Sequence, residues 1–94
     1  MLLKRELLEE IKAGKVDVIF RRWSRPTVKP GGTLKTKVGL LAIKSIVEMS
    51  PHDVTNADAR RAGFADVAAF HRWLETMKAG DFFHRIEVGY LGEA

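Results

Sequence analysis

The apolar run VGLLAIKSIV at residues 38–47 decides the fold of this chain. Only Lys44 and Ser45 interrupt it with polar side chains. Ser50-Pro51 ends it, because proline removes a backbone donor. A run of this length predicts a central strand that is buried on much of both faces. Residues 33–37, just before it, predict a neighbouring strand, on which Lys35 and Lys37 point to the same side.

The segments that precede this run predict one helix and one more strand. Leu3, Leu7 and Ile11 recur at helical spacing, so a helix is expected from about residue 2 to 13, with Gly14 as its C-terminal stop. Residues 16–21 then alternate, with Val16, Val18 and Phe20 on one face, which predicts a strand. The Pro and Gly residues between 26 and 32 predict a loop.

The segments that follow the run predict two helices and a last strand. Thr55, with Asp58 three residues later, is typical of a helix start, and Gly63 closes that helix. Asp66 is the expected N-cap of the next helix, which Gly80 terminates. That second helix carries an apolar stripe formed by Val67, Phe70, Trp73, Leu74 and Met77. In the last strand, the residues expected on one face are Phe82, Ile86, Val88 and Tyr90.

This order of elements predicts an α+β fold in a single domain that spans residues 1–94. Few strands are visible, so a curled or closed small barrel is expected, because closure would remove the exposed edges of the sheet. The chain has no cysteine, which excludes disulfides and thiolate metal sites. It has neither a long apolar span nor a signal-like start, so we expect a cytoplasmic protein that does not enter membranes. We expect no cofactor, and the pattern leaves the oligomeric state open.

Positive charge is concentrated in one third of the chain. Between Val18 and Val47 there are seven basic residues and no acidic one, whereas the net charge of the whole chain is +4. Such a one-signed segment favours a polyanionic partner. The seven residues of this basic window are Arg21, Arg22, Arg25, Lys29, Lys35, Lys37 and Lys44.

Trp23 adds an aromatic ring to the basic window. An indole ring can stack on an unpaired base, and the planar guanidinium of arginine can bind a phosphate through two hydrogen bonds, so the combination favours a nucleic acid. Strand alternation predicts that Arg21 and Trp23 share a face while Arg22 takes the other, with Arg25 and the lysines as a rim. The expected partner is single-stranded or loop RNA, since its bases are open to stacking. The residues predicted to bind RNA are Arg21, Arg22, Trp23, Arg25, Lys29, Lys35 and Lys37.

Three segments together resemble the ASCH domain family of the PUA-like superfamily: residues 11–21, the helix and Gly-Phe turn at 55–64, and residues 70–74. The resemblance covers nearly the whole chain. It implies a small PUA-like β-barrel with flanking short helices, and a cleft that receives RNA or a modified nucleobase. The family motif GxKxxExR falls on Gly14, Val16, Ile19 and Arg21, so its lysine and glutamate are apolar residues here.

A small hydrolase is the alternative function, acting on RNA as a ribonuclease or on an acylated nucleoside such as N4-acetylcytidine. Family members with the second activity use the motif lysine, and Lys15 lies one residue early, which on a strand turns a side chain to the opposite face. The histidines at 52, 71 and 84 have no metal-ligand spacing, so no metal site is expected. A protein-interaction or structural module is the third hypothesis. The candidate catalytic residues are Lys15, Arg21, His71 and Glu48, with Asp53 and Glu75 as further acids.

Overall fold

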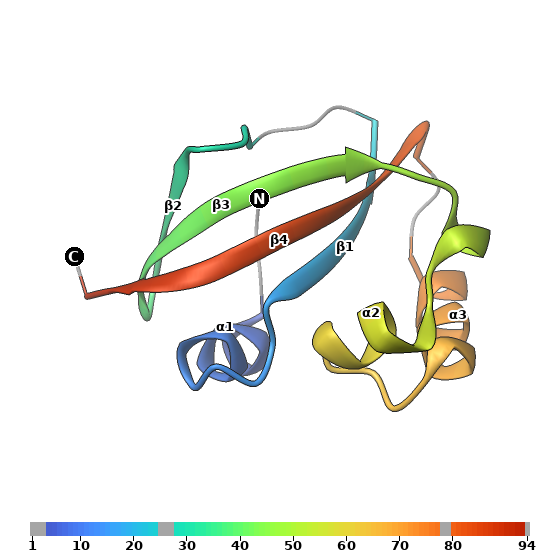
Figure 1. Cartoon of the computed structure of the whole chain (residues 1–94), viewed down its shortest axis with the longest axis horizontal. Helices are drawn as coiled ribbons and strands as arrows, with labels where there is room; N and C mark the ends of the chain where they lie inside the picture. Colours follow the sequence, from blue (N-terminus) through green and yellow to red (C-terminus); the bar gives the residue numbers. More distant parts are fainter. Residues whose placement is uncertain (1–3, 25–27, 78–79, 94) are drawn as a thin grey trace.

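Among the residues that the structure describes, the fold consists of three helices, a short 3-10 turn and four strands (Figure 1). The computed structural model describes residues 4–24, 28–77 and 80–93. The elements in chain order are α1 (Arg5–Lys12), β1 (Val18–Trp23), β2 (Thr33–Thr36), β3 (Gly39–Glu48), η1 (Pro51–Asp53), α2 (Asn56–Arg61), α3 (Val67–Glu75) and β4 (Phe82–Gly92). The expected α+β class is confirmed. None of the described helices is long and apolar enough to cross a membrane.

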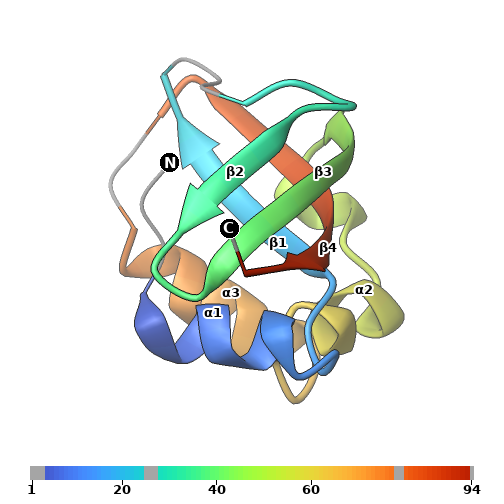
Figure 2. The same cartoon turned by 90° about the vertical axis from the view of Figure 1, so that its left-hand side faces the viewer.

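The four strands form one antiparallel sheet in the order β1-β4-β3-β2 (Figure 2). β3 has a neighbour on each side, as the apolar run predicts, but its burial is confined to one face and to the first half of the strand. Leu41 and Ile43 lie in the interior, whereas Lys44 and Val47 are exposed. The sheet of the described residues is strongly curved and not closed, with β1 and β2 at its edges, so the expected barrel is not confirmed.

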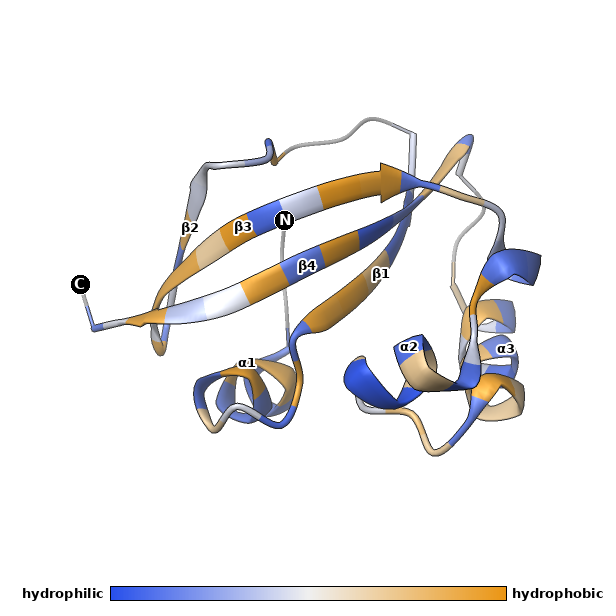
Figure 3. Cartoon of the chain, in the orientation of Figure 1, coloured by the Kyte–Doolittle hydropathy of each residue, from blue (hydrophilic) through white to orange (hydrophobic). Residues whose placement is uncertain are grey.

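Two apolar clusters cover the two faces of β1. The α1 cluster consists of Leu8, Ile11, Val16, Ile19, Val38, Leu41, Ile43, Ile86 and Val88. The α3 cluster consists of Val18, Phe20, Val54, Ala59, Phe70, Leu74 and Phe83. Successive residues of a strand point to opposite faces, so Val18, Ile19 and Phe20 can all be buried in a row. Figure 3 shows the change along β1, whose hydrophobic first half gives way to hydrophilic residues.

Several boundaries differ from the sequence expectation. The first strand starts at Val18 rather than at residue 16, because Lys15 and Val16 donate their N–H groups to Glu10 O and close the end of α1. Val16 is buried all the same. The helix expected to run to Gly80 ends at Glu75, where the N–H groups of Thr76 and Met77 bond to carbonyls three residues back. Residues 1–3, part of the helix expected from 2 to 13, lie outside the described residues.

Both predicted helix caps are confirmed. Thr55 Oγ1 accepts a hydrogen bond from the N–H of Asp58 at 3.2 Å, and Asp66 Oδ1 accepts one from the N–H of Ala69 at 2.8 Å. These bonds satisfy donors that a helix start leaves without an intrahelical acceptor. Because both caps sit on short helices between β3 and β4, they fix where the chain turns back toward the sheet.

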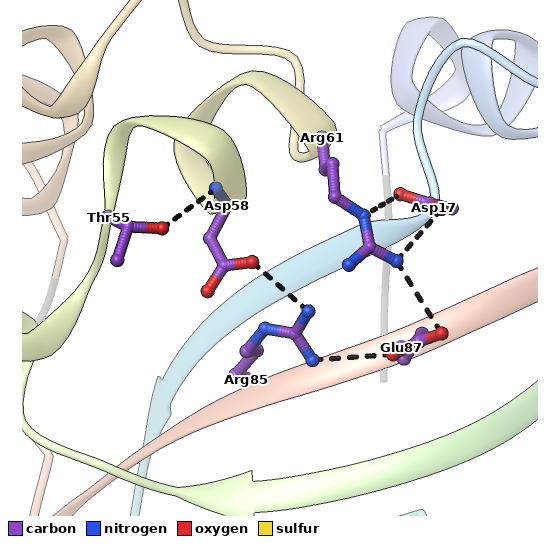
Figure 4. A network of polar contacts seen from close by, with 6 residues as sticks. All are labelled: Asp17, Thr55, Asp58, Arg61, Arg85 and Glu87. Atoms are coloured by element: carbon purple, nitrogen blue, oxygen red, sulfur yellow. Dashed lines mark hydrogen bonds and ion pairs between the residues drawn. The ribbon is translucent and has the colours of Figure 1, made fainter.

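A network of five alternating charges joins α2 to the sheet (Figure 4). Arg61 donates two hydrogen bonds of 2.9 Å to the carboxylate of Asp17, which precedes β1. The same guanidinium lies 3.5 Å from Glu87 Oε1, and Arg85 lies 3.4 Å from Glu87 Oε2. Arg85 also reaches Asp58 Oδ1 at 3.1 Å. The hydrogen bond from Arg61, strengthened by its charge, lowers the pKa of Asp17 below its usual value of 3.8.

Replacing Asp17 by Asn should lower the free energy of unfolding at neutral pH by about 1 kcal/mol or less, because both partners are partly exposed and water screens the pair. Since the folded-state pKa of Asp17 is depressed, the pair stabilises the fold fully above pH 3.8. That contribution is lost as the pH falls through the lowered pKa. Urea unfolding of wild type and Asp17→Asn from neutral to strongly acidic pH should show the difference shrinking in acid.

Asp53→Asn is the matched control, because Asp53 is exposed and forms no ion pair within the described part of the chain. Its effect should be small at every pH. A difference between wild type and Asp17→Asn that stayed constant from neutral to acidic pH would show that the charge of Asp17 contributes nothing to stability.

Candidate nucleic-acid interface

The predicted binding residues 21–23 end β1 and pair with residues 82–84 of β4. Trp23 packs against the α1 cluster, on the face that Ile19 also takes. By alternation Arg21 belongs to that face and Arg22 to the opposite one. Within the described residues β1 has a strand partner on one side only, so β1 is an edge strand of the sheet. The structure therefore places two arginines on opposite faces of one edge strand, with the indole on the same face as Arg21.

A hydrogen bond across the strands fixes the indole of Trp23. Its Nε1–H donates to Nδ1 of His84 at 2.7 Å, and the two rings meet edge to face with centroids 5.8 Å apart. His84 is only 7% exposed and is a buried polar residue within the core. Because Nδ1 accepts this bond, a neutral His84 carries its proton on Nε2. Without this bond the buried Nδ1 of His84 would lack a hydrogen-bond donor. The bond therefore satisfies the acceptor of His84 and at the same time orients the indole of Trp23.

Phe82 is a part of this site that sequence reasoning missed. Its strand position predicts a core residue on the face of Ile86, but it is 41% exposed, and Phe83 is buried in its place on the other face. Phe82 stands directly opposite Trp23 at the end of the sheet, and its ring lies 6.3 Å from that of His84. The sequence does contain a signal for this exposure. Phe82 is the first residue of its strand, directly after Gly80 and Asp81, and side chains at the ends of strands often lie outside the core.

Arg22 lines a hollow of about 560 Å³ at the end of the sheet where β1 and β3 stop and β4 starts. Glu48 and Met49 enter this hollow from the end of β3, and Asp81 and Phe82 enter from the start of β4. The hollow thus combines one guanidinium, two carboxylates and an exposed aromatic ring. The sequence separates these groups by up to sixty residues, so only the pairing of β4 with both neighbours brings them together.

Arg21 lines a different hollow, of about 550 Å³, between α1, the edge of β1 and the α2–α3 pair. Two acids from α1, Glu6 and Glu10, line it together with Lys4, so the charges around it balance. Phe64 and Trp73 form its aromatic wall, with centroids 5.2 Å apart. Trp73, expected in the core, is only partly buried, whereas Phe70 and Leu74 of the same stripe are buried.

Lys35 and Lys37 lie at the far end of the sheet from Trp23. They belong to the β2–β3 hairpin, where Leu40 pairs with Gly92 at the end of β4, whereas Trp23 pairs with Phe82 at its start. At about 3.3 Å per residue, the length of β4 separates the two ends by roughly 30 Å. The lysines share a hollow of about 510 Å³ with two cations and two acids of other elements. The basic window is therefore spread along the sheet.

Every ion pair between described residues uses a cation outside the basic window. The pairs found in the structure use Arg5, Lys12, Arg61 and Arg85, none of which belongs to the window. The window residues that form no ion pair within the described ranges are Arg22, Lys29, Lys35, Lys37 and Lys44. The predicted site residue Arg25 lies outside the described residues.

The structure does not bring the candidate catalytic residues together. Lys15 is exposed in the turn after α1, and His71 lies on α3 beside His52, with ring centroids 6.3 Å apart. Glu48 lines the hollow of Arg22, and Arg21 lines the other one. Each of these hollows contains one candidate at most, so no acid–base pair is assembled there. Nor do three His, Asp or Glu side chains gather as a metal site within the described residues.

Val16 and Ile19 occupy the lysine and glutamate positions of the GxKxxExR motif, and the structure shows where these two apolar residues lie. Both are nearly inaccessible in the α1 cluster, at 2% and 5% exposure. A lysine or a glutamate in the same environment would be charged, buried and without a partner, which costs several kcal/mol. The two residues therefore serve the core in this chain, and neither reaches a site.

Comparison of the chain with family models, with curated proteins and with solved structures gives no match in any of the three. The fold and function implied by the ASCH resemblance therefore rest on the residues of this chain alone.

The Trp23–His84 bond should be visible by nuclear magnetic resonance, because the two tryptophans form an internal comparison. Trp23 donates to His84, whereas the indole of Trp73 forms no hydrogen bond with any described residue. The indole proton of Trp23 should exchange with solvent more slowly than that of Trp73. His84→Ala should speed that exchange roughly two- to tenfold, the usual worth of one such bond.

The indole signal of Trp73 should stay unchanged in His84→Ala, which also reports that α3 keeps its packing. Equal exchange of both indoles in the wild-type protein would contradict the bond.

Proposed function

We propose that this chain is an RNA-binding domain of the ASCH type, with the PUA-like architecture that this resemblance implies, and that it binds single-stranded or loop RNA. Bases stack at the Trp23–Phe82 end of the sheet, and phosphates bind to cations of the basic window. The observation that carries the proposal is the absence of ion pairs at five window residues in the described part of the chain, while four cations elsewhere have acidic partners.

The aromatic groups support RNA rather than duplex DNA. Phe82 is exposed beside Trp23, whose plane is held by His84, so an exposed ring and an oriented, partly buried ring lie together at one end of the sheet. Single-stranded nucleic acids stack their bases on such rings, whereas the bases of a duplex are already stacked on one another. A ring that is already oriented loses little freedom on binding, which favours affinity.

The spread of the cations favours a polymer over a small anion. Arg22 at one end of the sheet and Lys35 at the other are separated by roughly 30 Å along β4. One phosphate group cannot contact both, but a chain of several nucleotides can. Lys29, in the loop between these two residues, and Lys44, on β3, are two further exposed cations of the window.

Binding of a fluorescent single-stranded RNA of about ten nucleotides, measured by anisotropy at several salt concentrations, tests this proposal. Each phosphate neutralised on a single strand contributes about −0.7 to the slope of log affinity against log salt. Replacing Arg22 and Lys29 together by Gln should therefore make the slope less negative by about 1.4. The matched control is Arg72→Gln plus Lys15→Gln, which removes two exposed cations outside the window.

Control and test variants lose the same net charge, so a general loss of attraction would affect both alike. Equal slopes in the two double variants would overturn the assignment of phosphate contacts to the window. A wild-type protein that binds no RNA at low salt would overturn the proposed function itself.

Phe82→Ala should weaken RNA binding roughly tenfold, because stacking on one aromatic ring is worth about 1 to 3 kcal/mol per base. The salt dependence should not change, since no charge is removed. Leu91→Ala is the control, because Leu91 is an exposed apolar residue near the opposite end of the same strand. Equal affinities for Phe82→Ala and Leu91→Ala would show that Phe82 does not contact a base.

A further inference from the structure

We propose that the hollow at Arg22 is a base-reading subsite that prefers guanine. This inference rests on the proposed function and adds a base preference to it. Phe82 provides the stacking surface, the carboxylates of Glu48 and Asp81 receive the N–H donors of the base, and Arg22 holds an adjacent phosphate. All four residues line the one hollow of about 560 Å³.

The charged groups of the hollow have unused hydrogen-bonding capacity. Arg22, Glu48 and Asp81 form no ion pair with one another, and none of the three side chains has a hydrogen-bond partner within residues 4–24, 28–77 and 80–93. Glu48 and Asp81 are exposed, and Arg22 is partly buried. Three charged groups that face one hollow without pairing are available to a ligand that offers both donors and acceptors.

The balance of charges excludes a simple anion site. Two carboxylates and one guanidinium give the lining a net charge of −1, so a free phosphate would be repelled more than it is attracted. A nucleotide is different, because its base presents N–H donors while its phosphate presents acceptors. The carboxylates and the arginine can then bind different parts of one molecule.

Guanine suits this lining better than the other bases. Its Watson–Crick edge carries two neighbouring donors, the ring N1–H and the 2-amino group, which match the two oxygens of one carboxylate. Adenine and cytosine offer one amino group on that edge, and uracil offers one ring N–H. A bidentate contact of this kind discriminates between bases, so a preference of roughly tenfold is expected. Phe82 adds stacking that every base shares.

The experiment compares the binding of four oligouridine hexamers in which one central position is guanosine, inosine, adenosine or uridine. Inosine lacks only the 2-amino group, so it removes one of the two donors. The wild-type protein should bind the guanosine oligomer roughly tenfold more tightly than the uridine oligomer, with inosine in between. The Glu48→Gln plus Asp81→Asn variant should bind all four oligomers with equal affinity.

Glu6→Gln plus Glu75→Gln is the matched control, because it removes the same charge from exposed acids outside this hollow. It should keep the guanosine preference. Guanosine monophosphate added to wild-type protein should also shift the backbone amide resonances of residues 48–50 and 81–83, which tests the site without any substitution.

The outcomes separate the inference from the proposed function. Equal binding of all four oligomers by wild type would overturn the guanine subsite and leave RNA binding standing. A guanosine preference that survives in Glu48→Gln plus Asp81→Asn would also overturn the assignment to this hollow. A protein that binds none of the oligomers would overturn both proposals.

Discussion

The position of β4 between β1 and β3 is the constraint on which the rest of the structure depends. Ile86 and Val88 of this strand enter the α1 cluster, and Phe83 enters the α3 cluster on the opposite face. One strand at the end of the chain therefore completes both parts of the core. In a domain of this size each buried side chain is a large share of the stabilising area, so the short helices depend on packing against a sheet that includes β4.

The same strand also carries the polar contacts that place α2. Arg85 and Glu87 alternate with the buried residues of β4 and meet Asp58 and Arg61 from α2. A helix of six residues has little stability of its own, and this network and the Thr55 cap supply the contacts that hold it. Alternation along β4 thus places Ile86 and Val88 on one face, in the α1 cluster, and Arg85 and Glu87 on the other face, where they contact α2.

The cations of the chain differ in whether they form ion pairs, and this difference bears on the proposed function. Cations outside the basic window are used in part for structure, whereas Arg22 and the lysines of the window stay available to a partner. The end of the sheet adds Phe82 and Trp23, because β1 stops there and leaves the rings without a further strand to cover them. Both features suit the single-stranded RNA that we propose as the ligand. Cations without ion pairs can bind its phosphates, and aromatic rings at the end of the sheet can stack on its bases.

The sequence by itself determined the elements with local causes. The helix caps at Thr55 and Asp66, the central strand and the one-signed basic window all follow from neighbours along the chain, where periodicity and capping act over a few residues. The tertiary structure alone decided that Val16 and Ile19 are core residues, that Phe82 is exposed, and that Arg22 meets Glu48 and Asp81 in one hollow. These facts depend on which strands pair and in which register, and register is set by the burial of whole faces rather than by any local segment.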